Sequence, residues 1–257
     1  MNVISVVSSK GGVGKTTVTA NLATAIARQG RTVLVLDLDP QNALGLHFGV
    51  APNEMRGVSR ATLAQQSCKS VVFESRGGVY VLPYGIVNEE DRSRFEHYLE
   101  AHPHWLGGLL QELSLPGDAL VLVDTPPGPS VYMKQALRAA NLALVVALAD
   151  AASYAALPMM QRLVQTYCVG QPHFLDCLYV VNQTDSARQL SKDVTQIMRS
   201  SFGERLIGAI HLDQSVGEAL ANDLSVLDYE SNSQAANDFR ACAEKIVQRL
   251  QHSRHFA

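Results

Sequence analysis

The fold of this chain is decided by one stretch near its start, Ser9-Lys10-Gly11-Gly12-Val13-Gly14-Lys15-Thr16-Thr17. An apolar segment, Val3 to Val7, precedes this stretch, and apolar residues at helical spacing follow it from Val18 onward. A strand, a glycine-rich turn and a helix are the context in which a phosphate-binding loop forms. The glycines let backbone N–H groups face phosphate oxygens, and the N-terminus of the helix adds its positive dipole end. The stretch therefore predicts a nucleoside triphosphate site, with Lys15 at the outer phosphates and the Thr16 hydroxyl on Mg²⁺.

The loop departs from the common pattern at its beginning. Ser9 stands where that pattern has glycine, and Lys10 adds a second lysine. Two lysines this close cannot comfortably serve one phosphate group from within the same loop. We expect Lys10 to project outward, where a second subunit could offer its own nucleotide. The alternative, a glycine turn that only permits tight packing, is disfavoured because the whole loop stands in the right context.

Apolar runs without alternation recur along the chain and alternate with helical patterns. They cover residues 32–36, 119–123, 142–148 and 178–181. Such runs are typical of parallel strands that helices cover on both faces. We predict an α/β fold, a mostly parallel twisted sheet flanked by helices on both faces. Residues 1–257 are expected to form a single domain with a helical elaboration at about 53–117, which includes a strand at 79–83 and a helix capped by Asn88.

Composition narrows the location and the partners. The formal net charge of −3 argues against a broad basic surface for nucleic acid. The longest apolar run, residues 142–149, is far shorter than the roughly 20 residues that span a bilayer. The phosphate loop begins so near residue 1 that no signal peptide is expected. We expect a cytoplasmic protein whose membrane contact, if it has one, is peripheral.

Patterns for a transition-metal site are weak. The four cysteines, Cys68, Cys168, Cys177 and Cys242, form no C-x-x-C pair and are expected to be small buried side chains. The cluster His102-Pro103-His104 has no neighbouring carboxylate or cysteine to complete a ligand set. The metal that the sequence predicts is therefore the Mg²⁺ of a nucleotide site.

Three aspartates follow predicted strands. Asp37 and Asp39 come after the run 32–36, and Asp124 ends the run 119–123, so all three are expected at the carboxyl edge of the sheet, where parallel sheets bind ligands. Asp124 is expected to hold Mg²⁺ through a water molecule, opposite Thr16. Phosphoryl transfer needs positioning, charge neutralisation and an oriented water, which aspartates on both sides of the phosphate would supply. Strand-end capping is the alternative for Asp37 and Asp39.

Two further segments have more than one interpretation. Residues 124–128, Asp-Thr-Pro-Pro-Gly, form a stiff turn that either senses the γ-phosphate or is an ordinary rigid loop. Residues 182–185, Asn-Gln-Thr-Asp, are similar to the guanine-reading motif of GTPases, with glutamine for lysine. The Asn182 amide could equally bind the adenine edge, so the residues alone leave the base open.

Residues 10–17, 37–41 and 124–128 together resemble the deviant Walker A ATPases of the ParA and MinD group, a resemblance that spans almost the whole chain. It implies a homodimer that sandwiches ATP, in which Lys10 crosses to the partner's phosphates, and it resolves the base in favour of adenine. It also implies a role for each site residue. Catalysis would use Lys10, Lys15 and Asp39; the nucleotide would contact Lys10, Gly11, Gly12, Val13, Gly14, Lys15, Thr16, Thr17 and Asn182; and Mg²⁺ would be supported by Thr16, Asp37, Asp39 and Asp124. Asp39 would position the attacking water.

Four longer stretches, residues 39–50, 82–85, 124–132 and 150–154, resemble the BcsQ family of ATPases in bacterial cellulose secretion systems. This resemblance implies an ATPase of slow, regulatory turnover that needs ATP and Mg²⁺. Its partners would be other proteins of the cellulose synthase system at the inner membrane or cell pole. It would support assembly, localisation or regulation of the synthase without making the glycosidic bond.

The sequence leaves three rival functions. A chromosome- or plasmid-partitioning ATPase of the ParA type needs basic residues for DNA, but Arg188, Lys192, Arg199 and Arg205 are scattered, so no nucleic acid partner is expected. A membrane-binding ATPase needs a basic amphipathic tail, and residues 251–257 offer one arginine and one phenylalanine, so no autonomous membrane anchor is expected. A nucleotide-locked scaffold that hydrolyses ATP too slowly to matter is the third.

Overall fold

The computed structural model describes residues 1–252 and contains one eight-stranded sheet. Its spatial order is β3-β4-β2-β5-β1-β6-β7-β8. The strands are β1 (Asn2–Val7), β2 (Val33–Asp37), β3 (Phe73–Glu74), β4 (Val79–Leu82), β5 (Leu120–Asp124), β6 (Leu142–Leu148), β7 (Asp176–Thr184) and β8 (Leu206–His211). All neighbouring strands are parallel except β3 and β4, which are antiparallel. The four apolar runs fall on β2, β5, β6 and β7, and the predicted parallel sheet is confirmed.

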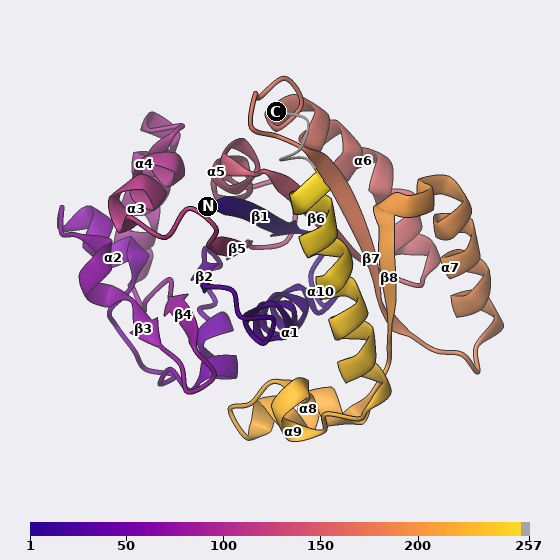
Figure 1. The fold of residues 1–257 in the computed structure, drawn as a ribbon. Coiled ribbons are helices and arrows are strands. Elements are labelled where there is room, and N and C mark those ends of the chain that lie inside the picture. The colour runs from indigo at the N-terminus through magenta and orange to yellow at the C-terminus, as the bar shows by residue number, and fades with distance from the viewer. Residues whose placement is uncertain (253–257) are drawn as a thin grey trace.

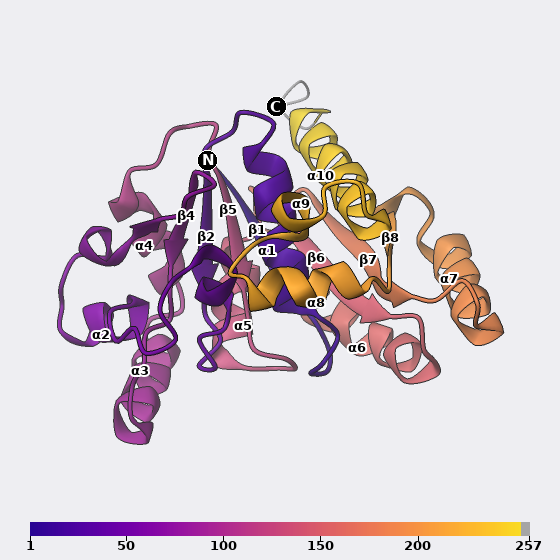
Figure 2. The same ribbon diagram turned by 90° about the horizontal axis from the view of Figure 1, so that it is seen from below.

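Helices cover both faces of this sheet, as Figures 1 and 2 show. The α-helices are α1 (Lys15–Ala27), α2 (Val58–Leu63), α3 (Glu89–Ala101), α4 (Trp105–Leu113), α5 (Val131–Ala139), α6 (Ala151–Tyr167), α7 (Gln189–Phe202), α8 (Gln214–Ala221), α9 (Val226–Tyr229) and α10 (Gln234–His252). Short 3-10 turns are η1 (Leu44–Phe48), η2 (Cys68–Val71) and η3 (Gly203–Arg205). Helices α1 and α10 pack on one face of the sheet, and α3 to α7 lie on the other.

The strands are apolar on both sides because both faces are buried. In β1, Ile4 and Val6 point toward α1 and α10, whereas Val3 and Val7 point to the opposite layer. Burying a side chain of this size contributes about 1.5–3 kcal/mol each, as an upper estimate. This two-sided burial explains why the sequence shows continuous apolar runs and not alternation.

Residues 53–117 add helices α2, α3 and α4 and the hairpin of β3 and β4 at one edge of the sheet (Figure 1). The Asn88 side chain accepts a hydrogen bond from the Asp91 N–H, which confirms the predicted cap of α3. An aromatic cluster holds this region to the sheet, because Phe95 packs edge-on against Tyr84 and Trp105 at centroid distances of 5.9 and 5.4 Å. The elaboration therefore shares a core with the sheet.

The burial of the cysteines and the lengths of the helices bear on two of the sequence-based expectations. Three of the four cysteines, Cys68, Cys168 and Cys242, are buried, and Cys177 is half-buried. Across residues 1–252, no helix has the length and apolar character that crossing a membrane requires. The prediction that the tail lacks a membrane anchor depends mainly on residues 253–257, which lie outside the described residues.

Candidate functional site

The phosphate-binding loop joins the end of β1 to the start of α1. Gly12 and Gly14 have φ angles of +76° and +77°, in the left-handed region that favours glycine. At Gly14 a side chain would also collide with a neighbour, since a Cβ there would lie 2.4 Å from the Asn182 amide nitrogen. Both the backbone conformation and the close approach therefore require glycine at the position that caps α1.

Lys15 and Thr16, the first two residues of α1, converge on Asp124 at the end of β5. The Lys15 ammonium lies 3.0 Å from one carboxylate oxygen of Asp124, and the Thr16 hydroxyl donates to the other at 2.6 Å. Burial raises the pKa of Asp124, and the nearby Lys15 charge opposes that rise. Lys15 is 6% exposed and Asp124 is fully buried, so the two charges compensate each other inside the protein. The structure thus brings together the three residues assigned to phosphate and metal.

Asp37 and Asp39 lie beside this group on the neighbouring strand. Asp37 pairs in register with Asp124, but its two carboxylate oxygens accept the N–H groups of Asp39 and Leu44. Burial raises the pKa of Asp37 well above its usual value, and the charge of Asp124 raises it further. Asp37 therefore braces the turn that carries Asp39, whose own carboxylate accepts the Gln41 N–H at 2.9 Å.

Lys10 lies apart from Lys15, toward solvent. Its ammonium forms an ion pair with both carboxylate oxygens of Asp150 at 3.1 Å, and the two side chains are 33% and 38% exposed. Asp150 also caps α6 by accepting the Ser153 N–H at 2.6 Å. Burial acts to raise the pKa of Asp150, but the bonds from Ser153 and Lys10 outweigh it and lower the pKa overall. Sequence reasoning gave Asp150 no role, although an aspartate three residues before Ser153, just after the run 142–148, signals a helix cap.

The segment after β5 is tied to the phosphate loop. The Thr125 hydroxyl donates to the Val6 carbonyl and the Gly128 N–H donates to the Ser8 carbonyl, each at 2.9 Å. Pro127 lies beside Gly11, 3.7 Å from the position that a Cβ on that glycine would take. A change in either loop would therefore move the other. This coupling is compatible both with a turn that senses the γ-phosphate and with an ordinary rigid loop.

Asn182, near the end of β7, also contacts the loop. Its amide nitrogen donates to the Val13 carbonyl at 2.8 Å, and among residues 1–252 no donor meets the amide oxygen, which can accept a hydrogen bond from a base. Gln183 has a φ angle of +54°, unusual for a residue with a side chain. The Asp185 carboxylate accepts the Ala187 N–H and pairs with Arg188. Because this carboxylate is engaged locally, the resemblance of 182–185 to a guanine reader does not extend to its aspartate.

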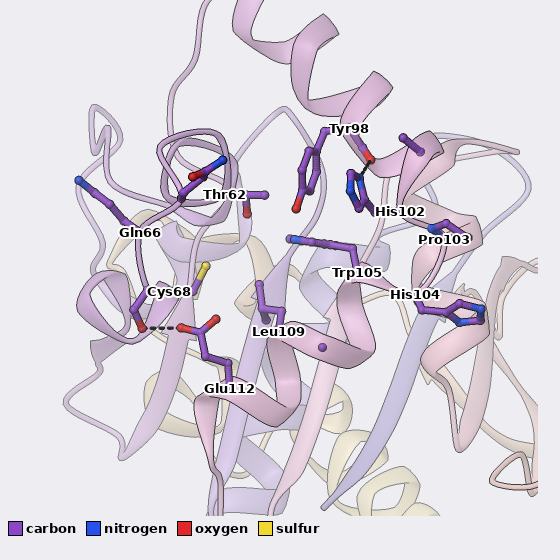
Figure 3. A pocket seen from close by; sticks show the side chains of 14 residues that line it. Thr62, Gln66, Cys68, Tyr98, His102, Pro103, His104, Trp105, Leu109 and Glu112 are labelled. Carbon is purple, nitrogen blue, oxygen red and sulfur yellow. Dashed lines mark hydrogen bonds between the residues drawn. The ribbon is translucent and has the colours of Figure 1, made fainter.

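The alternatives to this site are a cluster of metal ligands and a cleft elsewhere in the fold. Within residues 1–252, no group of three or more His, Cys, Asp or Glu side chains is placed to hold a metal ion. A cleft of about 850 Å³ opens between α2 and α4 (Figure 3), but none of the predicted site residues lines it. The predicted chemistry therefore gathers at the carboxyl edge of the sheet and not in this cleft.

Comparison with known proteins agrees with this geometry. Residues 1–247 match the family model described as cellulose biosynthesis protein BcsQ. The BcsQ protein of Escherichia coli K12 is 28% identical over 243 residues, which cover 95% of this chain and 93% of that protein. The chromosome-partitioning ATPase Soj of Thermus thermophilus is 27% identical over 260 residues, 96% of each chain. The crystal structure of the cell division ATPase MinD of Pyrococcus furiosus is similar with a TM-score of 0.75 and 25% identity, covering 96% of this chain and 98% of that one.

Proposed function

This chain belongs to the BcsQ family of cellulose biosynthesis proteins, and from that premise we propose that it is a dimeric ATPase switch of the ParA and MinD type. The chain binds and hydrolyses ATP with Mg²⁺, slowly and in a regulatory role. This proposal draws support from the convergence of Lys15, Thr16 and Asp124 and from the similarity to two proteins named as ATPases, Soj and MinD.

The residues fit a nucleotide with Mg²⁺. Mg²⁺ prefers oxygen ligands and usually keeps several waters, so one hydroxyl and a few carboxylates beside the phosphates are enough. Thr16 and Asp124 supply such oxygens, with Asp37 behind them. When bound, Mg²⁺ neutralises phosphate charge. Lys15 and the backbone N–H groups of the loop hold the phosphates, and Asp39 orients the attacking water.

The position of Lys10 is the single observation that carries the dimer. Lys15 points inward to a buried carboxylate, whereas Lys10 stands at the rim of the loop, a third exposed. A lysine there can reach the phosphates of a second copy. Three exposed apolar side chains, Ile86, Tyr154 and Leu212, come soon after the carboxyl ends of β4, β6 and β8, at the same edge.

In the cell, we place this switch in a bacterial cellulose secretion system. It remains cytoplasmic, as a single ATPase domain with the helical elaboration, and reaches the inner membrane through other proteins of that system. There it supports assembly, localisation or regulation of the cellulose synthase. The family match over residues 1–247 supports this role.

A DNA-binding role of the ParA type is the alternative. Of the four scattered basic residues, Arg188 is paired with Asp185 and Arg205 with Asp176, which lowers the positive charge available to phosphates. We therefore propose no nucleic acid partner. A salt-dependent shift of duplex DNA by the ATP-bound protein would favour the alternative.

The experiment is to replace Lys15 and Lys10 separately by alanine. Lys15→Ala should abolish ATP binding, and Lys10→Ala should leave ATP binding but prevent dimerisation or hydrolysis. In a bacterium that carries this gene, both should reduce cellulose output at unchanged protein level. Lys134→Ala, an exposed lysine on α5, is the matched control. Normal cellulose output in both loop variants would contradict the proposed role, and ATP binding by Lys15→Ala would contradict the site.

A further inference from the structure

The cleft of Figure 3, here called the aromatic cleft, lies between α2 with η2 on one side and α3 with α4 on the other. Pro103 and His104 at its rim also line a smaller cleft with Met1 and Val3, at the start of β1. The phosphate loop follows the opposite end of β1. A molecule in the aromatic cleft would therefore leave the nucleotide edge, and a second copy bound there, undisturbed.

One wall of the aromatic cleft is a fixed aromatic surface. Tyr98 and Trp105 are half-buried. Tyr98 stacks on His102 with ring centroids 4.1 Å apart, and Trp105 packs edge-on against the buried Phe95 at 5.4 Å. These contacts hold the rings in place before a ligand arrives, so binding costs little side-chain entropy.

The polar ends of these rings face the cleft without a partner. In Figure 3 the Tyr98 hydroxyl and the Trp105 indole nitrogen approach the same space, and neither forms a hydrogen bond within residues 1–252. At the far end Glu112 accepts the Ser67 hydroxyl at 2.5 Å and pairs with no cation among the described residues. The aromatic cleft thus offers hydrogen-bond donors along an aromatic wall and one negative charge beyond it.

These features select among the ways in which proteins bind peptides. A bound amphipathic helix needs a long apolar groove, but the buried apolar floor consists of Leu109 and Cys68. An added strand needs a free sheet edge, and this cleft is built from helices. A proline-rich segment has carbonyl acceptors, lacks N–H groups at its prolines and packs its rings on aromatic faces. We propose that the aromatic cleft docks an extended proline-rich segment of a partner protein, with a basic residue of that segment beside Glu112.

The chain carries a direct reporter, because Trp105 is its single tryptophan. The probe is a synthetic peptide of eight prolines with one arginine at each end, and the comparison peptide has alanines in place of the prolines. The proline peptide should shift the Trp105 emission saturably, and the alanine peptide should not. An unchanged emission at millimolar proline peptide, or an equal response to both peptides, would overturn the proposal.

Variants locate the binding by fluorescence anisotropy of a labelled proline peptide. Tyr98→Phe keeps the ring and removes the hydroxyl donor, and Trp105→Phe keeps an aromatic ring but removes the indole N–H together with part of the ring surface, so each should weaken binding at least about threefold. Glu112→Gln should weaken the arginine-flanked peptide and leave an uncharged proline peptide unaffected. Tyr167→Phe, on α6 and outside the aromatic cleft, is the matched control. If the three cleft variants bound the peptide with the same affinity as the wild type and the control, the peptide would bind elsewhere and the assignment would be refuted. ATP hydrolysis, measured in parallel, tests the proposed function separately.

Discussion

Replacing Asp150 by asparagine tests whether the ion pair with Lys10 holds the protein in its monomeric form. Both side chains are about a third exposed, so the pair is worth about 0.2–1 kcal/mol after screening by solvent. Asparagine keeps the oxygen that accepts the Ser153 N–H, so the cap of α6 is preserved. A sandwich dimer must release this pair in both copies. Asp150→Asn should therefore favour the dimer by about 0.4–2 kcal/mol, or roughly two- to thirtyfold in the dissociation constant.

The assay is sedimentation equilibrium with Mg²⁺ and a non-hydrolysable ATP analogue, at several protein concentrations. Asp91→Asn is the matched control, because it removes a similar surface ion pair, with Arg94, on α3. High salt should reduce the difference between the dimer dissociation constants of Asp150→Asn and the wild type, since salt screens exposed ion pairs. An unchanged or weaker dimer in Asp150→Asn would refute the reasoning, because Asp150 would then be neutral toward Lys10 or needed to position it.

Three further predictions concern the site and its surroundings. Asp39→Ala should lower ATP turnover at least about a hundredfold and leave an ATP-bound dimer, measured by phosphate release and gel filtration; turnover at the wild-type rate would remove Asp39 from the water-positioning role. Gly14→Ala should cost about 1–3 kcal/mol in unfolding free energy and abolish ATP binding, because a residue with a Cβ is strained at a φ of +77° and that Cβ would also displace the Asn182 amide. Gly107→Ala, inside α4 and with nothing within 4 Å, is the control and should stabilise the protein by up to about 1 kcal/mol in chemical denaturation. Burial lowers the pKa of His47 from 6.5 to about 4. As the pH falls from about 6.5 to about 4, the His47 imidazole is therefore protonated in the unfolded chain before it is protonated in the folded protein, and the free energy of unfolding decreases. The loss should reach about 3 kcal/mol near pH 4, and denaturant unfolding of His47→Gln should lack it; parallel pH profiles of the two proteins would contradict the assignment.

The sheet and the phosphate loop could be predicted because their signals are local. Continuous apolar runs mark strands buried on both faces, and the glycines of residues 11–14 mark the turn. Asp37 and Asp124 could be placed together as well, since the ends of parallel strands meet at one edge of a sheet. In the structure these two residues pair directly in register.

The side-chain partners across the chain could not be predicted from local patterns. Lys10 meets Asp150, and the Asn182 amide meets the Val13 carbonyl, over separations of 140 and 169 residues. Both contacts depend on the strand order, which puts β6 next to β1 and β7 next to β6. The apolar runs indicate strands but carry no information on that order. The aromatic cleft was also missed, because it forms only where α2 with η2 comes to face α3 with α4 in the folded chain.

The central claim, two copies facing each other across ATP, is tested most directly by the mass of the protein in solution. Sedimentation velocity of the wild type and of Lys10→Ala, with Mg²⁺ and either ADP or a non-hydrolysable ATP analogue, gives that mass. The account predicts a wild-type dimer with the ATP analogue, a monomer with ADP, and a Lys10→Ala protein that binds the analogue yet stays monomeric. A wild type that remains monomeric when saturated with the ATP analogue would contradict it.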